Sequence, residues 1–195
     1  MDDAGTVETD KVPIRETWEA LETVVDQGIA KSIGVSNFQA QALYDMHTYA
    51  RHPVSSLQIE HHPYLVQPDL IKLAGDFGIV VTAYSSFGPQ SFMELPGSFS
   101  VRAQGTELLL EASLIKEIAA KHGKTPAQVL LRWATQRGIS VIPKSNNPSR
   151  LAQNLDVVGF DLEKEELERI SALDKGLRFN DPGFYLTDHP LRLFA

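Results

Sequence analysis

The sequence contains no cysteine, which excludes disulfide scaffolds, thiol catalysis and cysteine-bound metals. It also has no apolar run of about 18 residues, so no membrane-spanning helix is expected. The first residues are acidic, with neither a basic nor an apolar region, so we expect no signal peptide and a cytoplasmic location. Positive charge is scarce, because 18 Lys and Arg against 25 Asp and Glu leave a net charge of −7. This balance argues against a general binder of nucleic acid or anionic membranes.

The 195 residues are 43% apolar and 22% charged, which is an ordinary globular composition and excludes a disordered chain. A chain of this length buries a real core, so we expect one folded domain. We place it at residues 12–182, between a loose N-terminal segment, 1–11, and a C-terminal tail, 183–195. From Gly176 onward the chain contains aromatic and turn-forming residues but no periodicity.

Apolar periodicity and turn residues predict helices that alternate with short strands. Strands are expected at 31–35, 56–60, 79–84 and 139–142. Helices are expected from 13, over 42–50, from 68, over 110–119, over 126–137, from 148 and over 162–173. Alternation of this kind indicates an α/β fold with a parallel sheet and helices packed outside it. The intervening segment 85–106 is rich in Gly, Pro and Ser, and its length favours a functional role.

Every predicted strand ends in side chains that can form hydrogen bonds. In parallel α/β folds ligands collect at the carboxyl ends of the strands, so these side chains are candidates for one site. They are Ser36 and Asn37, then Gln58 with His61 and His62, then Tyr84, Ser85 and Ser86, and finally Lys144, Ser145 and Asn146.

The segment around Lys144 is locally basic in an acidic chain. It contains Lys144 and Arg150 without an acidic residue between 138 and 155, and it leads into a helix that begins at Asn147-Pro148. Backbone N–H groups and the dipole at such a helix start favour an anion. The segment therefore predicts a phosphate site on Lys144, Ser145 and Arg150. The alternative is a solvated basic turn followed by an ordinary helix cap.

Two further features favour a nucleotide, each with a simpler alternative. Tyr84 offers a face on which a flat ring can stack, or it is a core aromatic at the sheet edge. The stretch from Ser85 to Gln90 offers hydroxyls and backbone N–H groups to a diphosphate, although loops of this composition are common.

Other polar residues carry less chemistry. His61 and His62 are adjacent on a strand, so their side chains are expected to point to opposite faces and not to share a metal. The remaining histidines, His47, His52, His122 and His189, are expected at the surface. The acidic run from Glu163 to Glu166 is expected to form a solvated first helical turn. No nucleophile elbow, Walker A loop or G-x-G-x-x-G motif is present.

The strand-end residues, taken together, resemble the aldo-keto reductase family. The resemblance is carried by Lys31-Ser-Ile-Gly-Val-Ser-Asn-Phe38 and by Ile142-Pro-Lys-Ser-Asn146 with Arg150 and Asn154. The segments 84–92 and 177–182 resemble fungal D-xylose reductases in particular. The match extends from about 12 to 182. It implies a (β/α)8 barrel of the TIM type, of which this chain covers about the last four βα units.

The resemblance also implies a role for individual residues toward NADPH, with NADH as a possible second cofactor. Ser36, Asn37 and Gln58 match residues that hold the nicotinamide carboxamide, and Tyr84 matches the residue that stacks on the ring. The implied diphosphate and ribose loop contains Ser85, Ser86, Gln90 and Glu94. The implied adenosine 2′-phosphate site is Lys144, Ser145, Asn146 and Arg150, with Asn154 at the adenine.

The implied reaction is hydride transfer to the carbonyl of a small aldehyde or sugar such as D-xylose, which yields an alditol. Asn180 matches a contact to a substrate hydroxyl. The family's Asp, Tyr, Lys and His tetrad has no matching motif here, so we assign no catalytic residue and expect little reductase activity from this chain. Two alternatives are a non-catalytic nucleotide- or partner-binding remnant and a truncated gene model. Open half-barrel edges would favour self-association.

Overall fold

The structure, a computed structural model, describes residues 10–95, 97–186 and 192–194. Its centre is a parallel sheet of four strands in the order β1 (Gly34–Ser36), β2 (Ser56–Glu60), β3 (Val80–Tyr84) and β4 (Ser140–Val141). In the register Gln58 lies between Ser36 and Thr82, and Thr82 pairs with Ser140. The predicted parallel α/β arrangement is confirmed, and four strands in one order are half of a (β/α)8 barrel. Both edge strands are unpaired on their outer side within the described part of the chain.

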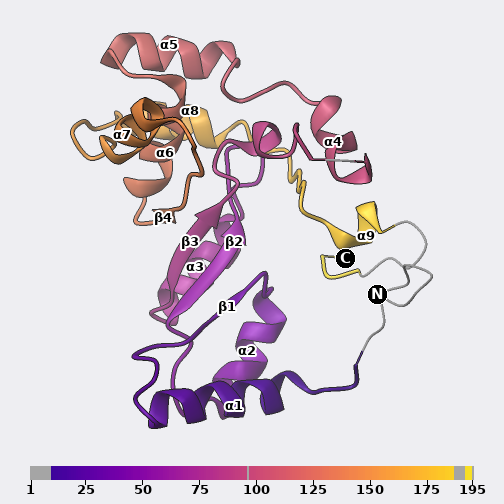
Figure 1. The fold of residues 1–195 in the computed structure, drawn as a ribbon. Helices are drawn as coiled ribbons and strands as arrows, with labels where there is room; N and C mark the ends of the chain where they lie inside the picture. Colours follow the sequence, from indigo (N-terminus) through magenta and orange to yellow (C-terminus); the bar gives the residue numbers. More distant parts are fainter. Residues whose placement is uncertain (1–9, 96, 187–191, 195) are drawn as a thin grey trace.

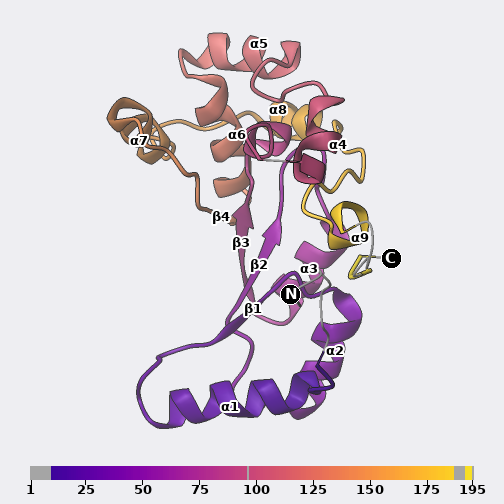
Figure 2. The same cartoon turned by 45° about the vertical axis from the view of Figure 1, so that its right-hand side comes forward.

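The larger helices lie around this sheet, and Figures 1 and 2 show α1 and α2 toward one end and α5 to α8 toward the other. Their bounds are α1 Ile14–Asp26, α2 Ala40–Tyr49, α3 Pro68–Asp76, α5 Ser113–His122, α6 Pro126–Thr135, α7 Pro148–Leu155 and α8 Lys164–Ser171. Local sequence sets several helix starts. At α6 the Thr125 hydroxyl accepts from the Gln128 N–H, while the Gln128 side chain accepts from the Thr125 N–H. The sequence Thr125-Pro126-Ala127-Gln128 has the residue pattern of such a reciprocal capping box.

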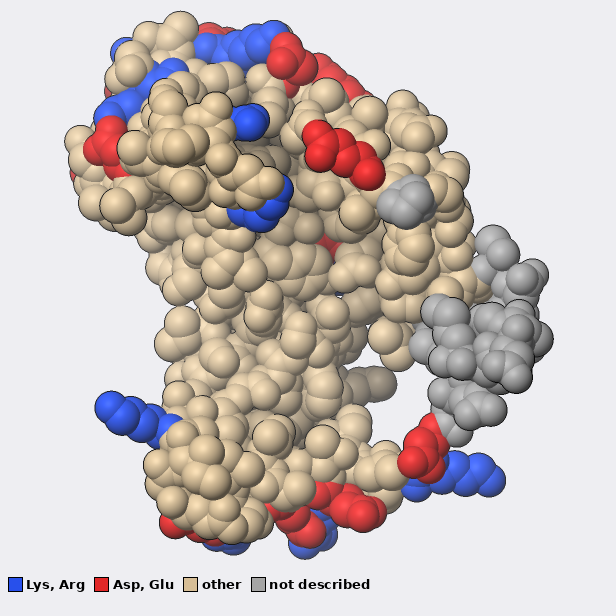
Figure 3. Space-filling view, viewed as in Figure 1, with Lys and Arg blue, Asp and Glu red and all other residues tan. Residues whose placement is uncertain are grey.

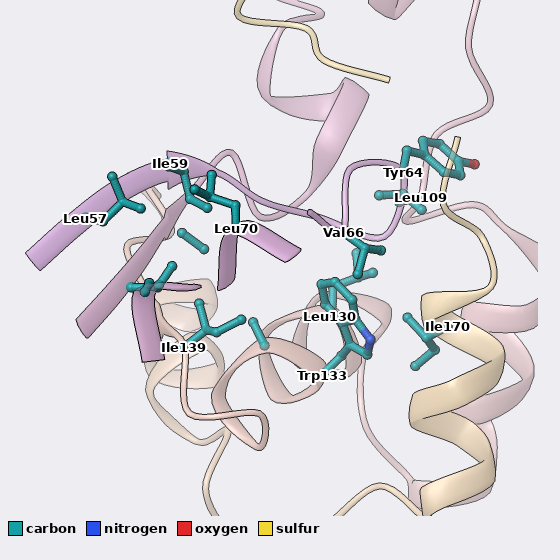
Figure 4. Packing of buried hydrophobic residues seen from close by; sticks show 14 of the residues in the cluster. Leu57, Ile59, Tyr64, Val66, Leu70, Leu109, Leu130, Trp133, Ile139 and Ile170 are labelled. Atoms are coloured by element: carbon teal, nitrogen blue, oxygen red, sulfur yellow. The ribbon is translucent and has the colours of Figure 1, made fainter. Parts of the chain in front are cut away.

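The hydrophobic core joins the sheet to α6 and α8. Leu57 and Ile59 of β2 are fully buried, and so are Leu130 and Trp133 of α6 (Figure 4). The Trp133 indole donates a 3.0 Å hydrogen bond to Ser171 in α8, so its polar edge is satisfied inside the core. The sheet that carries the strand-end residues is therefore anchored in the hydrophobic core.

Charged side chains are distributed unevenly over the molecular surface. On the face seen in Figure 3, Lys, Arg, Asp and Glu gather toward the two ends of the molecule, while the middle carries almost none. The sheet strands lie in this middle region (Figure 1). The middle of this face is therefore largely uncharged.

Two segments are more regular than the sequence predicted. The expected loop 85–106 contains the short helices η1 (Gly88–Ser91), η2 (Gly97–Ser100) and α4 (Val101–Gln104). The tail, expected to lack periodicity, forms α9 (Pro182–Tyr185). The Ser98 hydroxyl donates to the Tyr185 carbonyl at 2.9 Å, and the Arg102 guanidinium lies 3.9 Å from the Phe184 ring centre. These short helices are stabilised by contacts with one another, and the local periodicity of the sequence does not reveal such contacts.

The expected solvated turn of the last helix was wrong for Glu166. Its side chain is 3% exposed and accepts hydrogen bonds of 2.8 Å from Lys121 and His122 of α5. His122, expected at the surface, is therefore largely covered. Burial opposes ionisation of Glu166, but bonds from Lys121, the Glu163 N–H and His122 outweigh it and lower its pKa to about 2.

Some expectations fall outside the described residues. These are the structure of 1–9 in the predicted loose segment, and of His189 and its neighbours in the tail. None of the helices in the described ranges is long and apolar enough to cross a membrane.

Candidate functional site

The ends of β1 and β2 form the first part of the site. Asn37 has a left-handed backbone (φ 61°), which turns the chain so that its N–H donates to the Gln58 carbonyl at 2.9 Å. The Ser36 hydroxyl donates to the same carbonyl at 3.1 Å. Ser36 is exposed, whereas Asn37 and Gln58 are half-buried. The structure thus brings together the three residues predicted to hold a carboxamide.

A row of hydrogen bonds then crosses the strand ends. The Tyr84 hydroxyl donates to Asn37 Oδ1, and Asn180 Nδ2 donates to the Tyr84 oxygen, both at 2.9 Å. The Tyr185 hydroxyl extends the row by donating to Asn180 Oδ1 at 3.2 Å. Burial raises the pKa of Tyr84, although the hydrogen bond from Asn180 opposes this, so its hydroxyl stays protonated at neutral pH. The row fixes the edge of the half-buried Tyr84 ring.

The segment after β3 makes a tight turn. Ser85 has φ 53° and its carbonyl accepts from the Gly88 N–H at 2.8 Å. Ser86 is 5% exposed, and its hydroxyl has no hydrogen-bond partner among the described residues. Gln90 is half-buried in η1, and Glu94 is exposed beyond it. A buried hydroxyl without a partner is unfavourable unless a bound group or water satisfies it.

The basic segment after β4 is open to solvent. Lys144 and Arg150 are exposed, and neither takes part in an ion pair within the part of the chain that the structure describes. The N-terminal amides of α7 are not available, because Asn147 Oδ1 accepts from the N–H groups of Ser149 and Arg150. The amides that were expected to favour an anion are thus occupied by the helix cap given as the alternative. The candidate ligands of an anion here are side chains. Asn146 is exposed, and Asn154 is half-buried near the end of α7.

Glu60, at the end of β2, was not among the predicted site residues. Its carboxylate has no solvent exposure and accepts three hydrogen bonds, from His62 Nε2 at 2.9 Å and from the N–H groups of Phe179 at 2.8 Å and Asn180 at 2.9 Å. One feature of the sequence could have identified Glu60: it is an acidic residue at the end of an apolar strand, two positions before a histidine. The Glu60 side chain is held against the backbone of Asn180.

The two adjacent histidines follow β2 and do not lie on it as predicted, and they have different surroundings. His62 faces Glu60, whereas His61 stacks on Trp133 with the ring centres 4.8 Å apart. Burial, together with the positive charge of Arg137, lowers the pKa of His61 to about 3, so it is neutral. Among the described residues no group of three or more His, Cys, Asp or Glu is arranged to hold a metal ion.

Comparisons with known proteins agree with this architecture. The model of the Aldo/keto reductase family matches residues 7–175. A protein of Emericella nidulans named "Probable NAD(P)H-dependent D-xylose reductase" is 65% identical over 182 residues, which is 93% of this chain and 56% of that protein. The NAD(P)H-dependent D-xylose reductase of Aspergillus niger is 61% identical over 169 residues, 87% of this chain and 52% of that protein.

A solved structure supports the same fold. The aldose reductase from Schistosoma japonicum superimposes with a TM-score of 0.83 at 32% sequence identity, over 100% of this chain and 58% of that one. The chain spans about half the length of the curated relatives it matches. The strand-end motifs, the parallel half barrel and the match over most of the sequence together show that the chain belongs to the aldo/keto reductase family.

Proposed function

We propose that this chain binds a nicotinamide dinucleotide, and that it forms part of an NAD(P)H-dependent reductase of aldehydes and aldoses such as D-xylose. The proposed domain is residues 12–182, and the proposed location is the cytoplasm. The names of the similar fungal proteins support the reaction class. The arrangement of the strand ends supports the cofactor.

The observation that carries the proposal is the row Asn37–Tyr84–Asn180. Hydrogen bonds at the hydroxyl hold the half-buried Tyr84 ring in one orientation. The ring therefore offers a face of the kind on which a nicotinamide stacks. Next to it Ser36, Asn37 and Gln58 present hydroxyl and amide groups, and amides pair well with a carboxamide because each supplies a donor and an acceptor. Asn180 would then meet a substrate hydroxyl beside the ring.

The loop after β3 fits the middle of a dinucleotide. The buried Ser86 hydroxyl without a partner is the group that a diphosphate oxygen would satisfy, with Ser85 and Gln90 beside it. Glu94, exposed at the end of the same turn, is suited to a ribose hydroxyl.

The free cations after β4 fit the far end of the cofactor. We propose that Lys144, Ser145, Asn146 and Arg150 bind the 2′-phosphate of NADPH, with Asn154 at the adenine. Charged hydrogen bonds to phosphate are strong, so this group favours NADPH, while the remaining contacts also admit NADH.

The bound cofactor would supply a hydride to the substrate carbonyl. Protonation of the resulting alkoxide needs an acid, and the tetrad that provides one in this family has no motif in this sequence. We therefore propose that this chain binds and orients the cofactor and does not reduce D-xylose by itself.

Calorimetric and fluorescence titration of the full chain with NADPH tests the proposal. We expect saturable binding with one NADPH per chain and competition by 2′,5′-ADP. Absence of binding by a folded sample would contradict it. Turnover of D-xylose by the purified chain would contradict the second part, while leaving the cofactor site intact.

A further inference from the structure

Glu60 is a fully buried acidic residue, and none of the roles implied by the family resemblance falls on it. A carboxylate without solvent is costly unless donors surround it. Here both oxygens accept: Oε1 from His62 and the Phe179 N–H, and Oε2 from the Asn180 N–H. The donors come from two segments about 120 residues apart, which makes the carboxylate a joint between them.

The first of these segments is the C-terminal stretch 178–180, which belongs to no helix or strand. Its position depends on contacts to β2 and the loop after it. Besides the two bonds to Glu60, Arg178 donates to the Gln67 side chain at 2.8 Å, and Gln67 donates to the Glu60 carbonyl at 2.7 Å. Three consecutive residues of the stretch are thus tied to the end of β2.

The second segment contains His62, which lies near the loop after β3. The His62 ring donates to Glu60 and lies 5.4 Å from the Phe179 ring centre. The ring also lies near Gly88, where an added Cβ would be 3.6 Å from it. The pair Glu60–His62 therefore contacts the C-terminal stretch and lies near the proposed diphosphate loop.

We propose that Glu60 is a positioning residue for the nicotinamide end of the site. By fixing the Asn180 backbone it sets the Asn180 side chain, which donates to the Tyr84 hydroxyl and so orients the Tyr84 ring. Glu60 itself has no exposed surface, so it would act on a bound cofactor only through its neighbours. The inference rests on the proposed function, because it concerns the affinity of the same site for the nicotinamide half of the cofactor.

The substitution E60Q tests this with little change in volume. An amide has one acceptor oxygen where the carboxylate has two, so one of the backbone N–H groups of Phe179 and Asn180 loses its acceptor. We expect NADPH binding to weaken about tenfold, in line with loss of a charged hydrogen bond. Binding of 2′,5′-ADP, which lacks the nicotinamide, should not change. E165Q, at an exposed glutamate of α8, is the matched control and should bind both ligands as the wild type does.

A double-mutant cycle tests the route through Asn180. If Glu60 acts through that side chain, adding E60Q to N180A should weaken NADPH binding no further than N180A alone. Circular dichroism checks the fold of every variant. Where E60Q loses the native spectrum, E60D replaces it, because its shorter carboxylate also cannot reach all three donors.

The outcomes separate the two claims. Three results would each overturn the role of Glu60: equal weakening of NADPH and 2′,5′-ADP binding in E60Q, additive losses in the cycle, or an NADPH affinity of E60Q equal to that of the wild type. In each case NADPH binding by the wild-type chain would still uphold the proposed function. A wild-type chain that binds neither ligand would refute the proposed function, and the inference with it.

Discussion

The Tyr84 hydroxyl donates a 2.9 Å hydrogen bond to Asn37, two strands away in the sheet. This bond links the ends of β3 and β1 across β2, over the point where the Gln58 carbonyl accepts from Ser36 and Asn37. The phenol edge is thus held while the ring face stays half-exposed. A side chain held in this way loses little conformational entropy when a flat ring stacks on it.

The Tyr84 ring should contribute more to cofactor binding than its hydroxyl. We expect Y84A to weaken NADPH binding about tenfold, because a stacked aromatic partner is lost, whereas Y84F keeps the face and should lose less. The quench of tryptophan emission during titration with NADPH measures both. Equal affinity in Y84A and the wild type would place the nicotinamide elsewhere.

The basic segment should discriminate between the two cofactors. K144A and R150A should each weaken NADPH binding about tenfold and leave NADH binding nearly unchanged, because only NADPH carries the 2′-phosphate. Calorimetry with both cofactors measures the ratio. K164A removes a lysine that is also exposed, on α8, and serves as the control. If all three variants lose affinity alike, the effect is one of net charge and the proposed phosphate site is wrong.

Glu166 should make stability depend on acidic pH. Its pKa falls from 4.5 to about 2 on folding, so its ionised form stabilises the fold fully above about pH 4.5. This contribution, on the order of 3 kcal/mol, should be lost as the pH falls toward 2. Urea unfolding between neutral and acidic pH should show a shallower decline for E166Q than for the wild type.

The exposed neighbour supplies the control for that experiment. E165Q removes a glutamate from the same helical turn without removing a buried contact. An identical pH profile for E166Q and E165Q would show that the network of Glu166 with Lys121 and His122 does not stabilise the fold.

Gly88 should tolerate a side chain less well than another glycine of similar backbone. Gly88 and Gly123 have φ of 58° and 61°, but an added Cβ meets the buried Leu109 at 2.7 Å only at Gly88. We expect G123A to cost about 1 kcal/mol for its left-handed backbone, and G88A about 2 kcal/mol because packing strain adds to it. Thermal unfolding compares them, and equal losses would mean that Leu109 relaxes freely.

Much of the site could be predicted from the sequence because its parts are local. The order of strands and helices follows from periodicity, and the capping box at Thr125 needs only four consecutive residues. The residues predicted at the ends of β1, β2 and β3 do come together, since parallel strands bring their carboxyl ends to one edge. The start of α7 at Asn147-Pro148 was predicted as well, but two uses of its amides were left open. Asn147 there occupies the amides expected to bind an anion, and a sequence pattern does not tell which acceptor reaches them.

The sequence by itself determined the α/β alternation, the strand-end motifs and, through them, the family. Only the tertiary structure decided that Glu60 and Glu166 are buried, and that the tail forms α9 against the segment after β3. The reason is distance along the chain: Glu60 meets Asn180 across 120 residues, and Glu166 meets His122 across 44. The sequence does not show whether a carboxylate is hydrogen-bonded to water or to an N–H group far along the chain, because the folded structure determines which of the two lies beside it.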